Sequence, residues 1–163
     1  MKITIKPVET ESEILEKSHV HWKAWHQEHD GLLDQNYLDT FTLDKFITFA
    51  YRWQNGILIA KYKGCVIGFI WYGMCSEPLS DEGEIYALYI LKNYYKKNVD
   101  SKLLRIALGK LSKYRKIVVW VNEYNHRSIK FYKKCGFKFD GAIRRSKLDA
   151  KIKEFRMVWN NNG

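Results

Sequence analysis

The segment from Asn125 to Phe137 spaces its polar and aromatic residues as a short capped helix would. Asn125 is a favourable N-cap residue, and Ser128 falls at the third helical position, where its side chain faces the cap. Gly136 stands where such a helix needs a left-handed C-terminal cap. The helix would direct Tyr132 toward a neighbouring sheet, and a tyrosine hydroxyl, with a pKa of about 10, can donate a proton or a hydrogen bond. A half-buried core tyrosine is the alternative interpretation.

Four of the five histidines, His19, His21, His26 and His29, lie close together near the N-terminus. Imidazole nitrogens bind transition metals, and two of these residues are three positions apart, as on one helix face. No cysteine or firmly placed carboxylate completes a tetrahedral set, so we expect no metal site. The wall of a substrate pocket or an exposed helix face is the expected role.

The three cysteines, Cys65, Cys75 and Cys135, are widely spaced and form no C-x-x-C pair. This pattern indicates neither a disulfide framework nor a zinc knuckle, and a reducing cytoplasm is the expected location. No apolar run approaches the roughly 18 residues that a membrane span needs, and the N-terminus alternates like a strand rather than a signal peptide. We therefore expect no membrane partner.

These residues need a folded framework, and 163 residues suffice for one ordinary domain, which we expect to span 1–163. Periodicity predicts strands at residues 2–6, 57–62, 65–74, 84–90, 116–121, 137–144 and 152–159. It predicts helices at residues 11–28, 36–51, 99–114 and 125–135, and a loop at 78–83. Thr10 or Ser12 would cap the first helix, and the second would be split near Thr42. This order predicts an α/β fold, a mixed sheet with helices covering its faces.

The charges divide unevenly along the chain. Residues 1–90 carry 8 Lys and Arg against 13 Asp and Glu, and residues 91–163 carry 20 against 5, so their net charges are −5 and +15. The basic half predicts a polyanionic ligand such as a nucleotide, a phosphorylated cofactor or a nucleic acid, and the acidic half would attract a cationic substrate. Two solvated faces of opposite sign are the simpler alternative.

Two stretches resemble motifs of the GNAT superfamily of acyl-CoA-dependent N-acyltransferases. Residues 84–90, with the following loop and the helix near Ser101, are similar to motif A. The Asn-x-x-Ser-x-x-Phe-Tyr-x-x-x-Gly-Phe spacing of residues 125–137 is similar to motif B, and residues 22–39 resemble the two-helix entry region of many bacterial members. The resemblance covers nearly the whole chain. It implies the GNAT fold, with six to seven strands, about four flanking helices and splayed central strands.

The resemblance also implies a reaction, the direct transfer of an acetyl group from acetyl-CoA to an amine. The amine must be neutral to attack, and Glu84 is the candidate base, with a solvated strand-entry charge as its alternative. A backbone N–H near Ile90 would polarise the thioester carbonyl, and Tyr132 would protonate the departing thiolate. The residues that the resemblance assigns to cofactor binding are Tyr89, Ile90, Tyr95, Lys96, Lys97, Asn98, Val99, Asp100, Ser101, Asn125, Ser128, Tyr132 and Lys134.

The diphosphate loop departs from the family pattern, which reads Gln/Arg-x-x-Gly-x-Gly/Ala where this chain has residues 95–100. In such loops, successive backbone N–H groups at a helix N-terminus hold phosphate oxygens, and glycine permits close approach. Asn98 tolerates the left-handed region, whereas the Asp100 carboxylate repels phosphate and can cap the N–H groups that phosphates need. The lysines that could offset this repulsion are Lys92, Lys96, Lys97 and Lys102. CoA therefore either binds through these lysines or has lost its site.

The acceptor amine is less clearly indicated. Aromatic faces with nearby carboxylates suit a cation, and Trp25, Tyr37, Trp71 and Tyr86 are the predicted substrate residues. A polyamine, an aminoglycoside-like amine, an amino acid or a peptide N-terminus would each fit. The alternative is that most of these aromatic residues belong to the core.

Three function classes follow, of which an N-acetyltransferase acting on a small-molecule or peptide amine is the first. A catalytically silent GNAT-like binding module with weakened CoA affinity is the second. Nucleic-acid binding is the third, but no recognised motif accompanies the basic charge, so we expect no nucleic-acid partner. A homodimer is possible.

Overall fold

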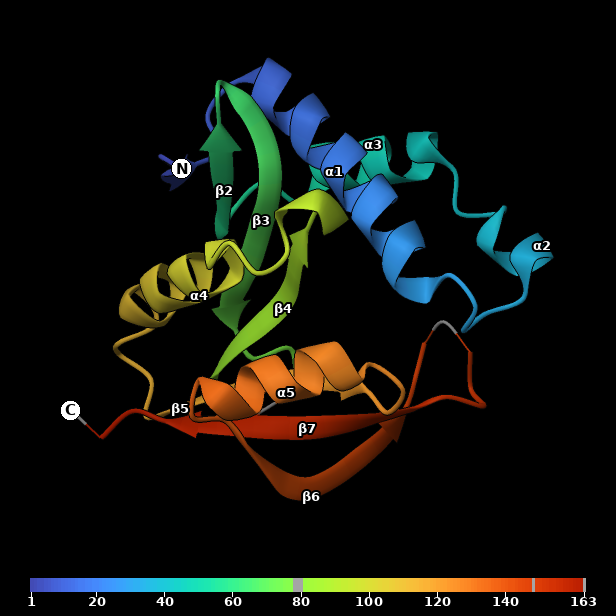
Figure 1. Cartoon of the computed structure of the whole chain (residues 1–163). Helices are drawn as coiled ribbons and strands as arrows, with labels where there is room; N and C mark the ends of the chain where they lie inside the picture. The colour runs from blue at the N-terminus through green and yellow to red at the C-terminus, as the bar shows by residue number, and fades with distance from the viewer. Residues whose placement is uncertain (78–80, 148, 163) are drawn as a thin grey trace. The chain divides into compact units, whose positions relative to one another are not determined.

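The computed structural model describes residues 1–77, 81–147 and 149–162 (Figure 1). The first half contains β1 (Thr4–Pro7), α1 (Glu11–His29), α2 (Gln35–Leu38), α3 (Leu43–Arg52), β2 (Ile57–Tyr62) and β3 (Cys65–Met74). The second half contains β4 (Gly83–Ile90), the 3-10 turn η1 (Lys92–Tyr94), α4 (Val99–Lys110), β5 (Lys116–Asn122), α5 (His126–Lys134), β6 (Lys138–Arg145) and β7 (Lys153–Asn160). Part of the loop predicted at 78–83, residues 78–80, lies outside the described residues.

The chain divides into two compact units. Unit 1 comprises Met1–Trp71 and Ala87–Ala107, and unit 2 comprises Tyr72–Tyr86 and Leu108–Gly163. Strands β3 and β4 each pass through both units. The strand order is β1-β2-β3-β4-β5-β7-β6, a mixed seven-stranded sheet, as the sequence predicts.

Unit 1 is built on antiparallel strands covered by helices. β2 pairs antiparallel with both β1 and β3, and α1 packs against α3 (Figure 1). Lys63 and Gly64, both with positive φ, make the tight turn between β2 and β3. Val20 of α1 packs with the buried strand residues Ile59 and Phe69, so the core lies between α1 and the sheet.

Glu13 ties the start of α1 to the first two strands. Its carboxylate accepts hydrogen bonds from Lys6 Nζ at 2.7 Å and from Lys61 Nζ at 3.1 Å. It also accepts from the backbone N–H of Thr10, while Thr10 Oγ1 accepts from the Glu13 N–H, which completes a capping box. The Lys6 hydrogen bond is the main cause that lowers the pKa of the Glu13 carboxyl to about 2.

We expect Glu13→Gln to destabilise the protein by about 1–2 kcal/mol at pH 7, because it removes charge-assisted hydrogen bonds. The folded-state pKa of Glu13 is lower than its ordinary value of 4.5, so this stabilisation is present above about pH 4.5 and disappears as the pH falls toward 2. Urea unfolding of both proteins at several pH values measures the difference. Glu9→Gln, at an exposed partner of Lys6, is the control and should change little. Equal stability of Glu13→Gln and wild type at pH 7 would contradict the assignment.

Unit 2 is built around β5. β5 pairs antiparallel with β7 over seven residue pairs, and β7 pairs antiparallel with β6. The parallel pairing of β4 with β5 covers only Gly83–Ile85 and Ile117–Val119. It ends before Tyr86 and Trp120, although both strands continue, so the two central strands separate within unit 2 as the fold prediction requires.

Candidate active site

The loop before α4 keeps a left-handed backbone without glycine. Lys96 has a φ of 62° and Asn98 a φ of 60°, and these are two of the three non-glycine residues with positive φ among those described. Such angles are uncommon for residues with a Cβ, although Asn tolerates them. The α4 helix begins directly afterwards at Val99. The loop therefore adopts a conformation that glycine would normally provide, at the position where the sequence predicts a diphosphate site.

Asp100 caps the first turn of α4, as its position suggests. Its Oδ1 accepts a hydrogen bond of 2.8 Å from the backbone N–H of Ser101. The Ser101 hydroxyl donates to the Asn98 carbonyl at 3.1 Å, and the Lys102 N–H donates to the same carbonyl at 3.2 Å. One N–H at the start of α4 is therefore already satisfied by a carboxylate.

At the end of β4, the predicted cofactor strand is held close to β3. The N–H of Leu91 donates to the carbonyl of Ile67 at 3.0 Å. A Cβ on Gly68 would lie only 2.9 Å from the Tyr89 carbonyl oxygen and 2.5 Å from Ile90 Cδ1, so this close approach requires glycine. The Tyr89 ring packs against the core, 5.1 Å from the His21 ring, and the role of a backbone N–H near Ile90 stays a prediction.

In unit 2, α5 has the predicted caps. Asn125 Oδ1 accepts a 3.1 Å hydrogen bond from the Ser128 N–H, and Gly136 follows the helix with a φ of 95°. Tyr132 is 5% exposed, and its ring lies 5.2 Å from the ring of Phe137. Lys134 is exposed. The spacing therefore positions Tyr132 firmly within unit 2, and its role as a proton donor stays a prediction.

Glu84 is 5% exposed and is not a solvated charge at the strand entry. Its carboxylate accepts hydrogen bonds from Ser76 Oγ at 3.0 Å, from the Ser76 N–H at 3.3 Å and from Cys75 Sγ at 3.5 Å. Tyr86, two residues along β4, donates its hydroxyl proton to the Met74 carbonyl. Burial, followed by the nearby Glu84 carboxylate, raises the pKa of Tyr86 to about 12. Tyr86 therefore stays protonated at neutral pH.

The other predicted substrate residues lie in unit 1. Trp25 is buried, and its ring lies 4.3 Å from the ring of His29 and 4.5 Å from that of Phe41. Tyr37 is exposed and contacts the same Phe41 ring edge-on. Trp71 packs edge-on against a phenylalanine of α3 instead. The structure thus brings Trp25 and Tyr37 together around Phe41, with Trp25 acting as a core residue.

Two histidines of the cluster lie close to backbone carbonyl groups, one of them in α1 and one in the segment between α2 and α3. His26 Nε2 lies 2.8 Å from the Phe41 carbonyl and His29 Nδ1 2.8 Å from the Trp25 carbonyl. Residues 1–77, 81–147 and 149–162 contain no group of three His, Cys, Asp or Glu that could hold a metal. Nor does any helix in these ranges have the length and apolar character needed to cross a bilayer.

Sequence reasoning missed a buried lysine in unit 1. Lys17 is 2% exposed, and its Nζ lies 4.5 Å from the ring centroid of Phe69 and 5.6 Å from that of Phe49. In the described part of the chain it has no hydrogen-bond or ion-pair partner. Burial lowers the pKa of Lys17 to about 8. Burial, followed by the Lys17 charge, holds the pKa of His21 well below its ordinary value.

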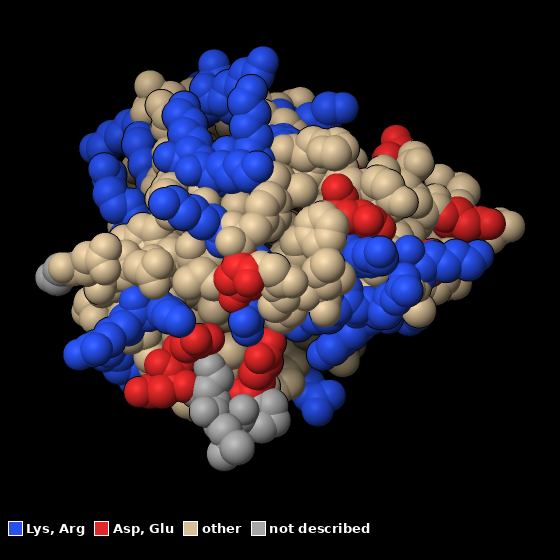
Figure 2. Space-filling model, turned by 90° about the horizontal axis from the view of Figure 1, so that it is seen from below, with Lys and Arg blue, Asp and Glu red and all other residues tan. Residues whose placement is uncertain are grey.

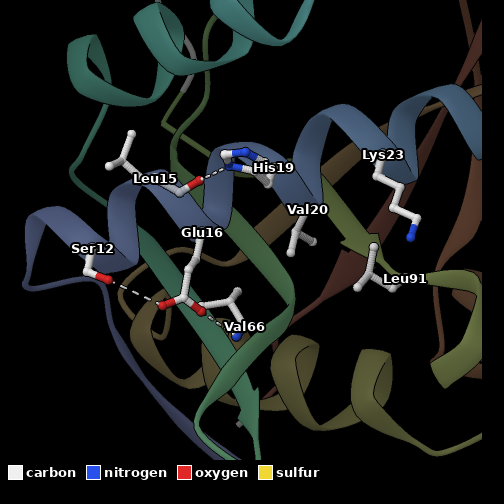
Figure 3. Close-up of a pocket in the computed structure, with 8 residues that line it drawn as sticks. All are labelled: Ser12, Leu15, Glu16, His19, Val20, Lys23, Val66 and Leu91. Carbon is white, nitrogen blue, oxygen red and sulfur yellow. Dashed lines mark hydrogen bonds between the residues drawn. The ribbon is translucent and has the colours of Figure 1, made fainter.

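A groove of about 460 Å³ runs along α1 in unit 1 (Figure 3). Glu16 spans it, since its carboxylate accepts hydrogen bonds from the Ser12 hydroxyl and from the Val66 N–H. Leu15, Val20 and Leu91 give it an apolar lining, with His19 and Lys23 at its rim (Figure 3). None of the residues predicted to bind the cofactor or to act in catalysis lines this groove.

The surface in Figure 2 carries several patches of lysine and arginine side chains, with smaller groups of aspartate and glutamate beside them. The net charge of the chain is +10. Such a surface attracts anionic ligands over distances of about a Debye length, roughly 8–10 Å.

A mixed sheet with two separating parallel strands, a left-handed loop before α4 and a capped tyrosine helix are features of an N-acetyltransferase. A model of the acetyltransferase (GNAT) family matches residues 18–137, and the chain belongs to this family.

Two curated relatives are similar to parts of the chain. An uncharacterized N-acetyltransferase of Mycobacterium tuberculosis is 30% identical over 91 residues, which are 55% of this chain and 56% of that protein. A probable spermine N(1)-acetyltransferase of Bacillus subtilis subsp. natto is 30% identical over 89 residues, 50% of this chain and 59% of that protein. The chain thus spans little more than half the length of these relatives.

The fold is that of a solved structure. The crystal structure of PaiA N-acetyltransferase from Thermoplasma acidophilum in complex with coenzyme A has a TM-score of 0.77. The two chains are 21% identical, and the match covers 98% of this chain and 99% of that one. This likeness establishes the GNAT fold.

Proposed function

We propose that the chain is a cytoplasmic, single-domain N-acetyltransferase that moves an acetyl group from acetyl-CoA to an amine of a small molecule or peptide. Membership of the GNAT family supports the reaction class, and the name of the spermine relative supports an amine acceptor. The observation that carries the proposal is the loop of residues 95–100, where Lys96 and Asn98 hold left-handed angles just before α4. Such a loop directs backbone N–H groups toward phosphate oxygens.

Acetyl-CoA, when bound, supplies the acyl group as a thioester. Glu84 accepts the proton that the attacking amine must lose, and the donors from Cys75 and Ser76 fix its orientation. A backbone N–H near Ile90 donates to the thioester carbonyl oxygen. Tyr132 gives its hydroxyl proton to the sulfur as the carbon–sulfur bond breaks. An N–C bond forms as the C–S bond breaks, and one proton leaves the amine as another reaches the thiolate.

Production of free thiol from acetyl-CoA in the presence of a panel of amines tests this proposal. Calorimetric titration with acetyl-CoA tests the binding step separately. Turnover with any amine supports the enzyme. Absence of turnover with every amine, together with absence of binding at millimolar acetyl-CoA, would refute the enzyme.

The second candidate is a catalytically silent binding module, and the Asp100 cap on the Ser101 N–H is the observation that favours it. A carboxylate at this position competes with the diphosphate for the same donor and repels its charge. Weak or undetectable acetyl-CoA binding in a folded protein that turns over no amine would select this second candidate.

We expect Asp100→Gly to tighten acetyl-CoA binding about tenfold, because it frees the Ser101 N–H and removes a like charge. Asp100→Asn removes the charge but keeps an oxygen that can cap, so it should give a smaller gain. Asp44→Gly, at an acidic residue in the first turn of α3, is the matched control and should leave the affinity unchanged. Calorimetry gives all four dissociation constants. Weaker binding by Asp100→Gly would show that Asp100 supports the site instead.

A further inference from the structure

Unit 2 gathers a second set of chemically active side chains on the sheet face that holds Glu84. Side chains of residues paired in register point to the same face, and alternate residues along a strand share a face. Glu84 pairs with Val118, so Tyr86 and Trp120, two residues further along each strand, lie on that face too. Trp120 pairs in turn with Arg156 of β7.

Arg144 of β6 reaches over this tryptophan. Its Cζ lies 4.3 Å from the centroid of the Trp120 ring, and Arg156 Cζ lies at 5.7 Å. This face of the sheet therefore carries the side chains of Glu84, Tyr86, Trp120, Arg144 and Arg156. A guanidinium stacked on an indole is held in a fixed plane, and its in-plane N–H groups stay open to a ligand.

The two arginines differ in how many of their guanidinium nitrogens have a partner in the protein. Arg156 donates from Nε and Nη2 to Asp140 at 2.7 Å, and its Nη1 lies 3.6 Å from Glu77. Arg144 donates from Nε to Glu154 at 2.8 Å, while its Nη1 and Nη2 have no hydrogen-bond partner within residues 1–77, 81–147 and 149–162. The Arg144 side chain is 33% exposed, so part of it is accessible to a ligand.

We propose that Arg144 determines specificity by binding a carboxylate of the acceptor, so that the substrate is an amino acid or a similar amino-carboxylate. This inference rests on the proposed acetyltransferase function. The open edge of a guanidinium matches a carboxylate with two parallel hydrogen bonds, and Trp120 and Glu154 hold that edge in place. An amine without an anionic group would leave these two donors unused.

The position of the guanidinium also limits the size of the acceptor. Although Arg144 comes from β6, its guanidinium lies over Trp120 of β5, the strand next to β4, which carries Glu84. Neighbouring strands are about 4.8 Å apart, so the carboxylate site and the base are roughly one or two strand spacings from each other. An amine and a carboxylate separated by a few bonds fit that interval. A polyamine offers no oxygen to Arg144 and would bring a cation beside it.

Acetylation of free amino acids compared with the matching amino acid amides tests the proposal, because the amide keeps the amine and loses the carboxylate. For the wild type, we expect KM to be about 10- to 100-fold lower for the acid than for the amide. Arg144→Gln should raise KM for the acid to that of the amide while leaving kcat and the amide KM unchanged. Arg144→Lys, which keeps the charge but not the fork, should restore part of the preference.

Arg145→Gln is the matched control, since Arg145 follows Arg144 on β6 and points to the opposite face. It should leave the preference intact. Calorimetric binding of the acids and amides provides the same comparison without turnover, so it remains informative even if no amine is acetylated. Equal affinity for acid and amide, or a preference for spermine over amino acids, would overturn the role of Arg144. Absence of both turnover and acetyl-CoA binding would instead overturn the proposed function.

Discussion

Replacing Tyr132 by phenylalanine is expected to lower turnover at least about 100-fold while leaving the affinity for acetyl-CoA nearly unchanged, because a positioned proton donor contributes about 10²–10⁴-fold. The substitution removes one oxygen atom. The ring, which packs against those of Phe131 and Phe137 in unit 2, stays in place. Steady-state rates report the loss of the proton donor, and calorimetry reports the binding of acetyl-CoA.

Tyr124→Phe is the matched control for this experiment. Tyr124 lies just before the N-cap of α5 and is exposed, so its hydroxyl should be dispensable. Unchanged turnover of Tyr132→Phe would refute the general-acid role. Loss of acetyl-CoA binding with intact turnover of the bound carrier would assign Tyr132 to binding alone.

The second large expected effect is an increase in stability. We expect Lys17→Met to stabilise the protein by about 1–4 kcal/mol at pH 7, the range of the stabilising cases in which even a buried ion pair is replaced by apolar side chains of similar volume. Lys17 is almost fully buried among phenylalanine rings, and among the described residues it has no ion-pair partner to offset its desolvation. Attraction to the Phe69 ring offsets only part of that cost.

The pH dependence identifies the cause. The folded-state pKa of Lys17, about 8, is lower than its ordinary value of 10.5, so the unfolded chain binds one more proton between these values. Wild-type stability should therefore rise as the pH increases from about 8 to 10.5, relative to Lys17→Met. Urea unfolding over this pH range measures the free energy of unfolding of both proteins. The contributions of the other titrating groups cancel in the difference between the two values.

Lys23→Met, at an exposed position of the same helix, is the control for Lys17→Met and should change stability little. A Lys17→Met protein that is less stable than the wild type at pH 7 would contradict the proposed desolvation cost. So would a stability difference that stays constant between pH 8 and 10.5.

Most of the fold could be predicted because hydrophobic period and turn residues agree. The helical stretch predicted at 36–51 is split around Thr42, and the Lys63-Gly64 turn joins β2 to β3, both as expected. The helix predicted at 99–114 ends at Lys110, and this boundary was wrong. Leu111 and Tyr114 are buried in the turn after α4, so the apolar pattern continues beyond the helix.

The features of the candidate site also fall into those that could be predicted from sequence and those that could not. Local hydrogen bonds that depend on spacing alone, such as the Asn125–Ser128 cap and the Asp100–Ser101 cap, could be predicted from sequence. The burial of Lys17 could not, because a lysine in an amphipathic helix is expected to lie at the surface. The stacking of Arg144 over Trp120 depends on the register of three strands, which no local pattern specifies.

The Asp100 cap also affects how CoA would dissociate after the reaction. If CoA occupies the loop before α4, its diphosphate must displace the Asp100 carboxylate from the Ser101 N–H. That carboxylate stays nearby and competes with the diphosphate for the same N–H. When CoA dissociates, the Asp100 carboxylate forms its hydrogen bond with the Ser101 N–H again, and this favours dissociation. Since product release limits many enzymes, a loop that holds its carrier loosely favours rapid cycling wherever the carrier is abundant.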